Sequence, residues 1–270
     1  MEIDTGTNEL LCVVKDGVAL ITLNRPDARN AMSPDLTAAL RTQIKARGDD
    51  SAVGALLITG AGTAFCSGGD VKAMGGRGPR GQMSYEERLG DLRWRQSNLT
   101  GALFAVRKPT IAALPGAAAG AGLAIALACD MRIAAKSAFA ATGYARIGLS
   151  GDYGMSWLLT RTVGPMRARE LMLTAERVDA ERCERIGLVN RVVDDAKLQE
   201  EAFAWAKSLA DGPQIAFRNM KDNLDEALGI DYPTAMHREA ERLVQSSRTE
   251  DHKEAVQAFV EKRKPVFTGR

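Results

Sequence analysis

The chain of 270 residues carries 36 Lys and Arg against 34 Asp and Glu, and a net charge of only +2 gives no reason to expect a nucleic-acid partner. The length is enough for one domain with a full core, with or without a smaller appendage. The four cysteines are scattered without a CxxC pair, and the N-terminus does not resemble a signal peptide, so we expect a reduced, cytoplasmic protein that binds no metal and no membrane.

The first 60 residues predict a hairpin, a helix and a strand. Residues 10–14 and 17–23 are rich in β-formers, and Asp16-Gly17 between them favours a tight turn. Ser33 and Pro34 are typical of an N-cap and first helical position, and they precede apolar residues with helical spacing. The apolar run 53–59 predicts a buried strand.

Two glycine-rich loops follow apolar strands, and the rest of the chain is organised around them. The first loop is AFCSGGDVKAM at 64–74, and the second begins PGAAAGAG at 115–122, after a strand predicted at 110–114. The paired Gly68 and Gly69 allow backbone dihedrals that point N–H groups at a ligand. Two such loops suggest two N–H donors that converge on one oxygen.

The remaining segments predict an α/β core followed by helices. Residues 74–96 are either a mobile lid or a surface insertion. A buried helix at 120–128 and a strand at 131–135 follow, and the run 111–129, broken by Pro115, is too rich in Ala and Gly for a membrane span. Further helices at 155–161, 168–174 and 180–186 and a strand at 188–193 are expected, and a boundary near residue 197 separates the core, 1–197, from a helical region, 198–270.

Several common catalytic motifs are missing. The glycines after strand 110–114 have Ile125 at the third position of a dinucleotide fingerprint, which argues against NAD binding. There is no P-loop and no GxSxG elbow, and the two histidines, His237 and His252, lie in the C-terminal helices. Cys66, with no histidine near it in sequence, is interpreted as a packing residue.

The motifs taken together resemble the crotonase, or enoyl-CoA hydratase/isomerase, superfamily. They extend in register over almost the whole chain from about Leu10, and they are LNRPDARNAM (23–32), AFCSGGDVKAM (64–74), PGAAAGAGLAIALACDMRIA (115–134), RIGLSGDYG (146–154), GLVNRVV (187–193) and the ending DHKEAVQAFVEKRKPVFTGR (251–270). The resemblance implies an α/β spiral of ββα units with C-terminal helices that build a homotrimer or homohexamer. It also implies an acyl-CoA thioester substrate and no other cofactor.

The resemblance also assigns roles to individual residues. The backbone N–H groups of Gly69 and Ala121 would bind the thioester oxygen. The residues expected to line the CoA site are Arg25, Ala28, Gly68, Asp70, Val71 and Lys72. Lys262 or a neighbour on the last helix would reach the 3′-phosphate, within the chain or across a subunit interface. For Lys72 and Lys262 a solvated surface cation is the alternative.

The two glutamates that hold water in family hydratases are absent, because the corresponding positions are Ala124 and Tyr144. Asp152 is the remaining acid, at a position where isomerases of the family carry a proton-shuttling carboxylate. A lone carboxylate suits isomerisation, because one base can remove a proton from C2 and return it at C4. The alternatives are that Asp152 caps the helix starting near Tyr153, and that Tyr144 packs rather than donates a hydrogen bond.

These observations favour a Δ3,Δ2-enoyl-CoA isomerase or a close relative, with Gly69 and Ala121 as donors and Asp152 as proton shuttle. An enoyl-CoA hydratase of fatty-acid degradation, with a non-standard base, is the second hypothesis. A non-catalytic acyl-CoA-binding protein that kept the fold is the third.

Overall fold

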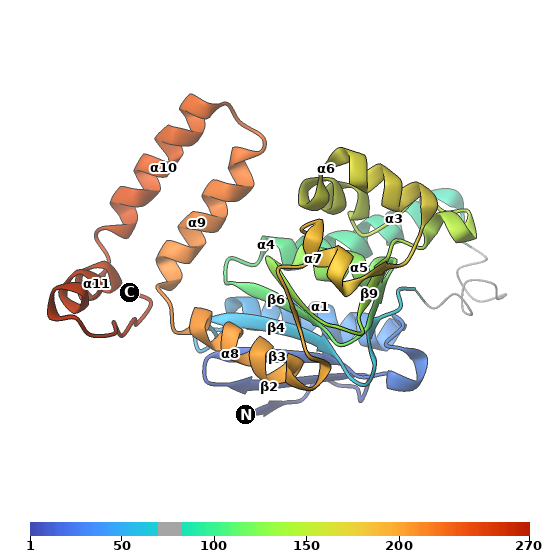
Figure 1. Cartoon of the computed structure of the whole chain (residues 1–270), viewed down its shortest axis with the longest axis horizontal. Helices are drawn as coiled ribbons and strands as arrows, with labels where there is room; N and C mark the ends of the chain where they lie inside the picture. The colour runs from blue at the N-terminus through green and yellow to red at the C-terminus, as the bar shows by residue number, and fades with distance from the viewer. Residues whose placement is uncertain (70–82) are drawn as a thin grey trace.

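Two β-sheets and a set of surrounding helices form the protein in the computed structural model, which describes residues 1–69 and 83–270 (Figure 1). The larger sheet has seven strands in the order β1-β2-β3-β4-β6-β8-β11. Its strands are β1 (Glu2–Ile3), β2 (Leu10–Lys15), β3 (Val18–Leu23), β4 (Ala55–Gly60), β6 (Thr110–Leu114), β8 (Met131–Ala135) and β11 (Arg191–Val193). The smaller sheet has the order β10-β9-β7-β5 and contains β5 (Ala64–Cys66), β7 (Ala117–Ala119), β9 (Phe139–Ala141) and β10 (Val178–Asp179).

Consecutive strands alternate between the two sheets. β4, β6 and β8 pair in parallel in the large sheet, and the strands that follow them, β5, β7 and β9, pair in parallel in the small one. Helices separate the successive pairs, so that each repeat is a ββα unit. The predicted spiral is therefore confirmed, and it repeatedly brings the segment after a small-sheet strand to the same side of the molecule.

The predicted hairpin and first helix are also confirmed. β2 and β3 are antiparallel, and the turn between them places Asp16 at φ 51° and Gly17 at φ 74°, as a tight hairpin turn requires. Helix α1 (Pro34–Asp49) begins after Ser33, whose side chain accepts a hydrogen bond from the Leu36 N–H. Its apolar face packs against the large sheet.

The remaining helices follow in chain order. They are η1 (Pro26–Ala28), α3 (Tyr85–Gln96), the π-helical η3 (Ser97–Gly101), α4 (Ala102–Ala105), α5 (Ala121–Ala128), η4 (Tyr144–Ile147), α6 (Met155–Thr174), α7 (Ala180–Arg185), η5 (Asp195–Lys197), α8 (Leu198–Ala210), α9 (Gln214–Ala227), α10 (Tyr232–Ser246) and α11 (Glu250–Glu261). The separate helices expected at 155–161 and 168–174 are joined in α6, which is interrupted at Gly164 (φ 79°, ψ 163°) before Pro165. The strand predicted at 188–193 is shorter in the structure, where β11 covers Arg191–Val193.

The C-terminal helices differ in how they contact the rest of the chain. α8 packs on the strands of the large sheet, whereas α9 and α10 run side by side away from the sheets and α11 lies at the lower end of this pair, near the start of α9 (Figure 1). The proposed boundary near residue 197 stays a prediction, and the projecting part begins after α8. Among the described residues, no helix is long and apolar enough to cross a membrane.

Candidate active site

The first glycine loop is held by the turn that follows β3. The Ser67 N–H donates to the Arg29 carbonyl at 3.0 Å, and the Met32 N–H donates to the Gly68 carbonyl at 2.8 Å. Gly68 has φ +94°, a conformation that a side chain would strain, and it turns the chain sharply after β5. These contacts fix the peptide between Gly68 and Gly69. The Gly69 N–H has no hydrogen-bond acceptor among the described residues.

Asn30 anchors this turn to the sheets from a fully buried position. Its side-chain Nδ2 donates to the carbonyls of Ala61 (3.0 Å) and Ala64 (2.8 Å), and its Oδ1 accepts from the Arg25 N–H at 2.8 Å. The buried amide thus satisfies three backbone groups that would otherwise lack partners. The turn, β5 and the first loop consequently form one connected unit. Sequence reasoning missed this role of Asn30.

The second glycine loop leads directly into helix α5. Gly120 has φ +51°, and its N–H donates to the Ala141 carbonyl at 3.0 Å. All eight residues of α5 are buried, and no side chain caps its N-terminus. The Ala121 N–H therefore lies in a dry environment at the positive end of a helix, and it has no acceptor within the described ranges. Such a donor suits a developing negative charge on oxygen.

The two loops are in direct contact. A Cβ built on Gly68 would lie 2.8 Å from the Ala119 carbonyl oxygen and 3.5 Å from the Ala121 nitrogen. A Cβ on Gly122 would lie 2.3 Å from the carbonyl oxygen of Cys66. The first turn of α5 therefore lies against the end of β5. This geometry supports the prediction that both loops contribute to one site.

The segment after β9 lies beside the second loop. β7 and β9 pair so that Ala119 is opposite Ala141, and the Thr142 carbonyl oxygen would be 3.7 Å from a Cβ on Gly120. Tyr144 follows two residues later and is 5% exposed. Its hydroxyl donates a hydrogen bond of 2.6 Å to Oδ1 of Asp152. The structure thus brings together the position of one absent glutamate and the candidate base.

The structure bears on one alternative for Asp152 and on the role of Tyr144. Helix α6 begins at Met155 with Gly154 as its N-cap and no side-chain cap, so the interpretation of Asp152 as a helix cap is wrong. Tyr144 is a hydrogen-bond donor as well as a packed residue. Its specific partner could not be read from the sequence, because the chain between the two residues has positive φ angles at Gly148 and Gly151.

Burial dominates the electrostatics of this pair. It raises the pKa of the Asp152 carboxyl above the ordinary value, and the hydrogen bond from Tyr144 partly offsets that increase. Burial and the neighbouring carboxylate raise the pKa of the Tyr144 phenol far above its usual range. Tyr144 therefore remains protonated and donates, while the pKa of the Asp152 carboxyl is shifted upward from that of an exposed aspartate.

Only some of the residues predicted to line the CoA site are described by the structure. Asp70, Val71 and Lys72 lie outside the described residues, as does the 74–82 part of the candidate lid. Arg25 is partly engaged: its Nε lies 3.0 Å from Glu9 Oε1 and its Nη1 donates to the Ala31 carbonyl at 2.5 Å. Ala28 ends η1, next to the first loop.

Lys262 and Cys66 are the two other residues to which the sequence assigned a role. Lys262 is the C-cap of α11, and α11 lies far from α5 within one chain (Figure 1), so a contact of Lys262 with CoA at this site would come from a second subunit and stays a prediction. Burial raises the pKa of the Cys66 thiol to about 12, which fits its interpretation as a packing residue.

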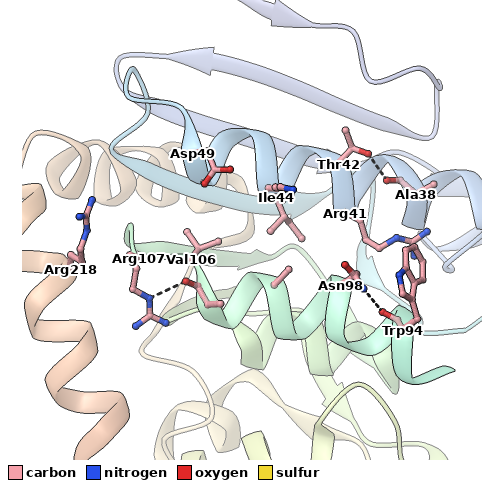
Figure 2. Close-up of a pocket in the computed structure, with 14 residues that line it drawn as sticks. Ala38, Arg41, Thr42, Ile44, Asp49, Trp94, Asn98, Val106, Arg107 and Arg218 are labelled. Atoms are coloured by element: carbon pink, nitrogen blue, oxygen red, sulfur yellow. Dashed lines mark hydrogen bonds between the residues drawn. The ribbon is translucent and has the colours of Figure 1, made fainter. Parts of the chain in front are cut away.

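A hollow of about 820 Å³ lies elsewhere, between α1 and the segment from α3 to α4. Figure 2 shows Arg41 and Trp94 at one end and Arg218 of α9 at the other. The guanidinium of Arg41 stacks over the Trp94 ring at 4.9 Å. Gly69, Ala121 and Asp152 do not line this hollow. It is therefore separate from the candidate active site.

The chain has extensive similarity to known proteins. A family model described as enoyl-CoA hydratase/isomerase matches residues 14–270. A protein of Rhodobacter capsulatus named "Probable enoyl-CoA hydratase" is 40% identical over 95% of this chain and 96% of its own length. The "1,2-epoxyphenylacetyl-CoA isomerase" of Escherichia coli K12 is 36% identical over 97% of this chain and 98% of its own length. The crystal structure of an enoyl-CoA hydratase from Polaromonas sp. JS666 superimposes with a TM-score of 0.89 at 30% identity, and it covers 96% of this chain and 99% of that one.

Proposed function

The chain belongs to the enoyl-CoA hydratase/isomerase, or crotonase, family of enzymes, and within that family we propose that it moves a carbon–carbon double bond, as a Δ3,Δ2-enoyl-CoA isomerase or a close relative. The observation that carries this proposal is the 2.6 Å hydrogen bond between Tyr144, which is buried, and Asp152, which is half-buried, in the segment that follows β9. Among the described residues Asp152 supplies the carboxylate, and Ala124 and Tyr144 stand at the two positions where a hydratase of the family has glutamates. Relatives of similar identity are named both hydratase and isomerase, so the names do not distinguish the two activities, and the proposal is based on the residues of the site.

The proposed reaction uses two kinds of group. Asp152 removes a proton from C2 of a 3-enoyl thioester, and the electron pair of that C–H bond moves toward the thioester carbonyl to form a dienolate. The N–H groups of Gly69 and Ala121 stabilise the negative oxygen. The protonated Asp152 then delivers the proton to C4, the double bond shifts to C2=C3, and the carboxylate is regenerated. No water takes part in the chemistry.

This proposal is tested by product analysis in deuterated water. A 3-enoyl-CoA should be converted to the 2-enoyl-CoA, with deuterium at C2 or C4 in proportion to exchange of the Asp152 proton. Mass spectrometry and NMR identify the product, and the same measurement on 2-enoyl-CoA checks the reverse reaction. Formation of 3-hydroxyacyl-CoA at an ordinary enzymatic rate would instead establish a hydratase with a non-standard base. Absence of change in both thioesters would contradict both activities.

We further propose that the enzyme acts as a homotrimer or homohexamer built through α9, α10 and α11. These helices project from the sheets and expose apolar side chains (Figure 1). The exposed residues include Met220, Leu224, Leu228, Leu243, Val244, Phe259 and Val260. A soluble monomer rarely leaves such a surface uncovered. The CoA contacts predicted for Gly68, Arg25, Ala28 and Lys262 belong to the same proposal.

The assembly is checked by multi-angle light scattering. We expect three or six times the chain mass of 29.0 kDa. Leu243→Glu, which places a charge on the exposed face of α10, should lower the measured mass, whereas Lys45→Glu on an exposed part of α1, outside the proposed interface, provides a charge-changing control. A monomer at micromolar concentration would contradict the proposal.

A further inference from the structure

The side chain of Asp152 is held asymmetrically. Its Oδ1 accepts the 2.6 Å hydrogen bond from Tyr144, while its Oδ2 has no hydrogen-bond partner among the described residues. Tyr144 sits in the short helix η4 and is 5% exposed, so its hydroxyl has little freedom to reorient. One carboxylate oxygen is therefore occupied and the other is left to exchange a proton.

The backbone beside Asp152 is held from a different direction. The Tyr153 N–H donates to Oε1 of Gln96 at 2.9 Å, and the Asp152 carbonyl accepts from the Met155 N–H at 3.0 Å. Tyr153 has φ +51°, an uncommon conformation for a tyrosine that needs support from its surroundings. Gln96 is the last residue of α3, where the chain enters the π-helical η3. The Asp152 loop is thereby attached to α3 as well as to η4.

We infer that Tyr144 is a positioning residue for the proton shuttle: its hydroxyl fixes Asp152 Oδ1, so that Oδ2 alone is presented to C2 and C4 of the acyl chain. This inference rests on the proposed isomerase function. Movement of one proton between two carbons favours a base with a single fixed proton-exchanging oxygen. Gln96 supports the same orientation through the adjacent peptide.

The hydrogen bond also favours the ionised form of the half-buried Asp152, against the effect of burial. Burial favours the neutral acid, whereas donation from Tyr144 favours the carboxylate, and only the carboxylate can accept a proton from C2. Among the described residues, Tyr144 is the ionisable group that acts on Asp152 directly. Further out, Tyr153 acts on Tyr144, and the guanidinium of Arg41 from α1 interacts with Tyr153 and with Asp91 and Arg95 of α3.

The variant Tyr144→Phe removes the hydroxyl and leaves the ring. Loss of the donor should raise the pKa of Asp152, so the acid limb of the kcat/KM profile should move to higher pH. Because a hydrogen bond to a charged group is lost, kcat/KM should fall about tenfold on the acid side of the profile. At high pH it should recover toward the wild-type value. Tyr232→Phe, on an exposed part of α10, is the matched control and should leave the profile unchanged.

A second variant has the opposite expected sign and keeps the shape of the ring. Site-specific 3-fluorotyrosine at position 144 is a stronger donor, so the acid limb should move to lower pH. A merely structural Tyr144 would give an equal fall at every pH for Tyr144→Phe and no shift for the fluorinated protein, and that result would overturn the inference.

The inference and the proposed function fail in distinguishable ways. Carbon-13 NMR titration of the Asp152 carboxyl in the unliganded protein reports the coupling to Tyr144 without any substrate. Wild-type protein that does not isomerise 3-enoyl-CoA would overturn the function. An active wild type whose Asp152 titration is the same in Tyr144→Phe would overturn the inference alone.

Discussion

Asp152→Asn should abolish double-bond migration while acyl-CoA binding survives. Asparagine has the same shape and its amide oxygen can still accept the hydrogen bond from Tyr144, but it cannot take a proton from carbon. General base catalysis contributes about 10²- to 10⁴-fold, so kcat should fall by about 10³-fold or more. The measurement is the rate of conversion of 3-enoyl-CoA to 2-enoyl-CoA, with the dissociation constant of a non-reactive acyl-CoA determined in parallel.

The pH dependence of this variant follows from the burial of Asp152. In the wild type, kcat/KM should fall as the pH drops through the pKa of Asp152, and because that pKa is raised, the fall begins above the range of an ordinary aspartate. The residual rate of Asp152→Asn should lack this acid limb. Asp35→Asn, in the exposed first turn of α1, removes a carboxylate without touching the site and should retain the wild-type profile.

The effect of Asp152 on stability provides a check that does not depend on activity. The upward shift of its pKa fixes the sign of this effect. The ionised Asp152 is disfavoured in the folded state, so its cost to folding is present above the raised pKa and disappears below the unfolded-state pKa, where both states are protonated. Asp152→Asn should therefore unfold at the same or a higher temperature than the wild type at pH 8, with no gain at low pH. In the activity measurement, undiminished conversion of 3-enoyl-CoA by Asp152→Asn would contradict the proposed role of Asp152 as proton shuttle.

The architecture could largely be predicted from local signals and from motifs in register. Asp16-Gly17 and Ser33-Pro34 mark a turn and a helix start whose physics is local, and the structure confirms both. The strands of the small sheet were not predicted as separate elements. β7 is three alanines, a sequence without β propensity, and it is a strand because β5 and β9 pair with it on both sides. Such pairing between distant segments leaves no signature in the strand itself.

The site was predictable only in its backbone parts. Glycines at 68, 69 and 120 indicate loops that can present backbone N–H groups to a ligand, and the structure places these loops in contact. The contact between Tyr144 and Asp152, which are eight positions apart in the sequence, depends on side-chain direction, which periodicity does not encode. The roles of Asn30 and Gln96 depend on partners 34 and 57 residues away, respectively, and no sequence motif marks them.

Gly122→Ala should damage both the fold and the reaction, because α5 and β5 touch at this glycine. The added Cβ would lie 2.3 Å from the carbonyl oxygen and 2.7 Å from the Cβ of Cys66, and neither atom belongs to a flexible side-chain end. Relief requires the first turn of α5 to move away from β5. We expect a loss of about 1–3 kcal/mol in the free energy of unfolding, the range for overpacked cores.

The same movement should misplace the Ala121 N–H relative to the first loop. Loss of one oxyanion donor costs about 10²- to 10³-fold in kcat, so turnover should fall by that factor in the fraction that remains folded. Gly90→Ala is the matched control, because Gly90 lies within α3 with nothing within 4 Å of the added Cβ, and it should be neutral or slightly stabilising. Urea unfolding and turnover, measured on both variants, separate the two effects. A destabilised Gly122→Ala with unchanged kcat would mean that the N-terminus of α5 supports the fold without stabilising the oxyanion, and the second donor would then have to be sought elsewhere in the chain.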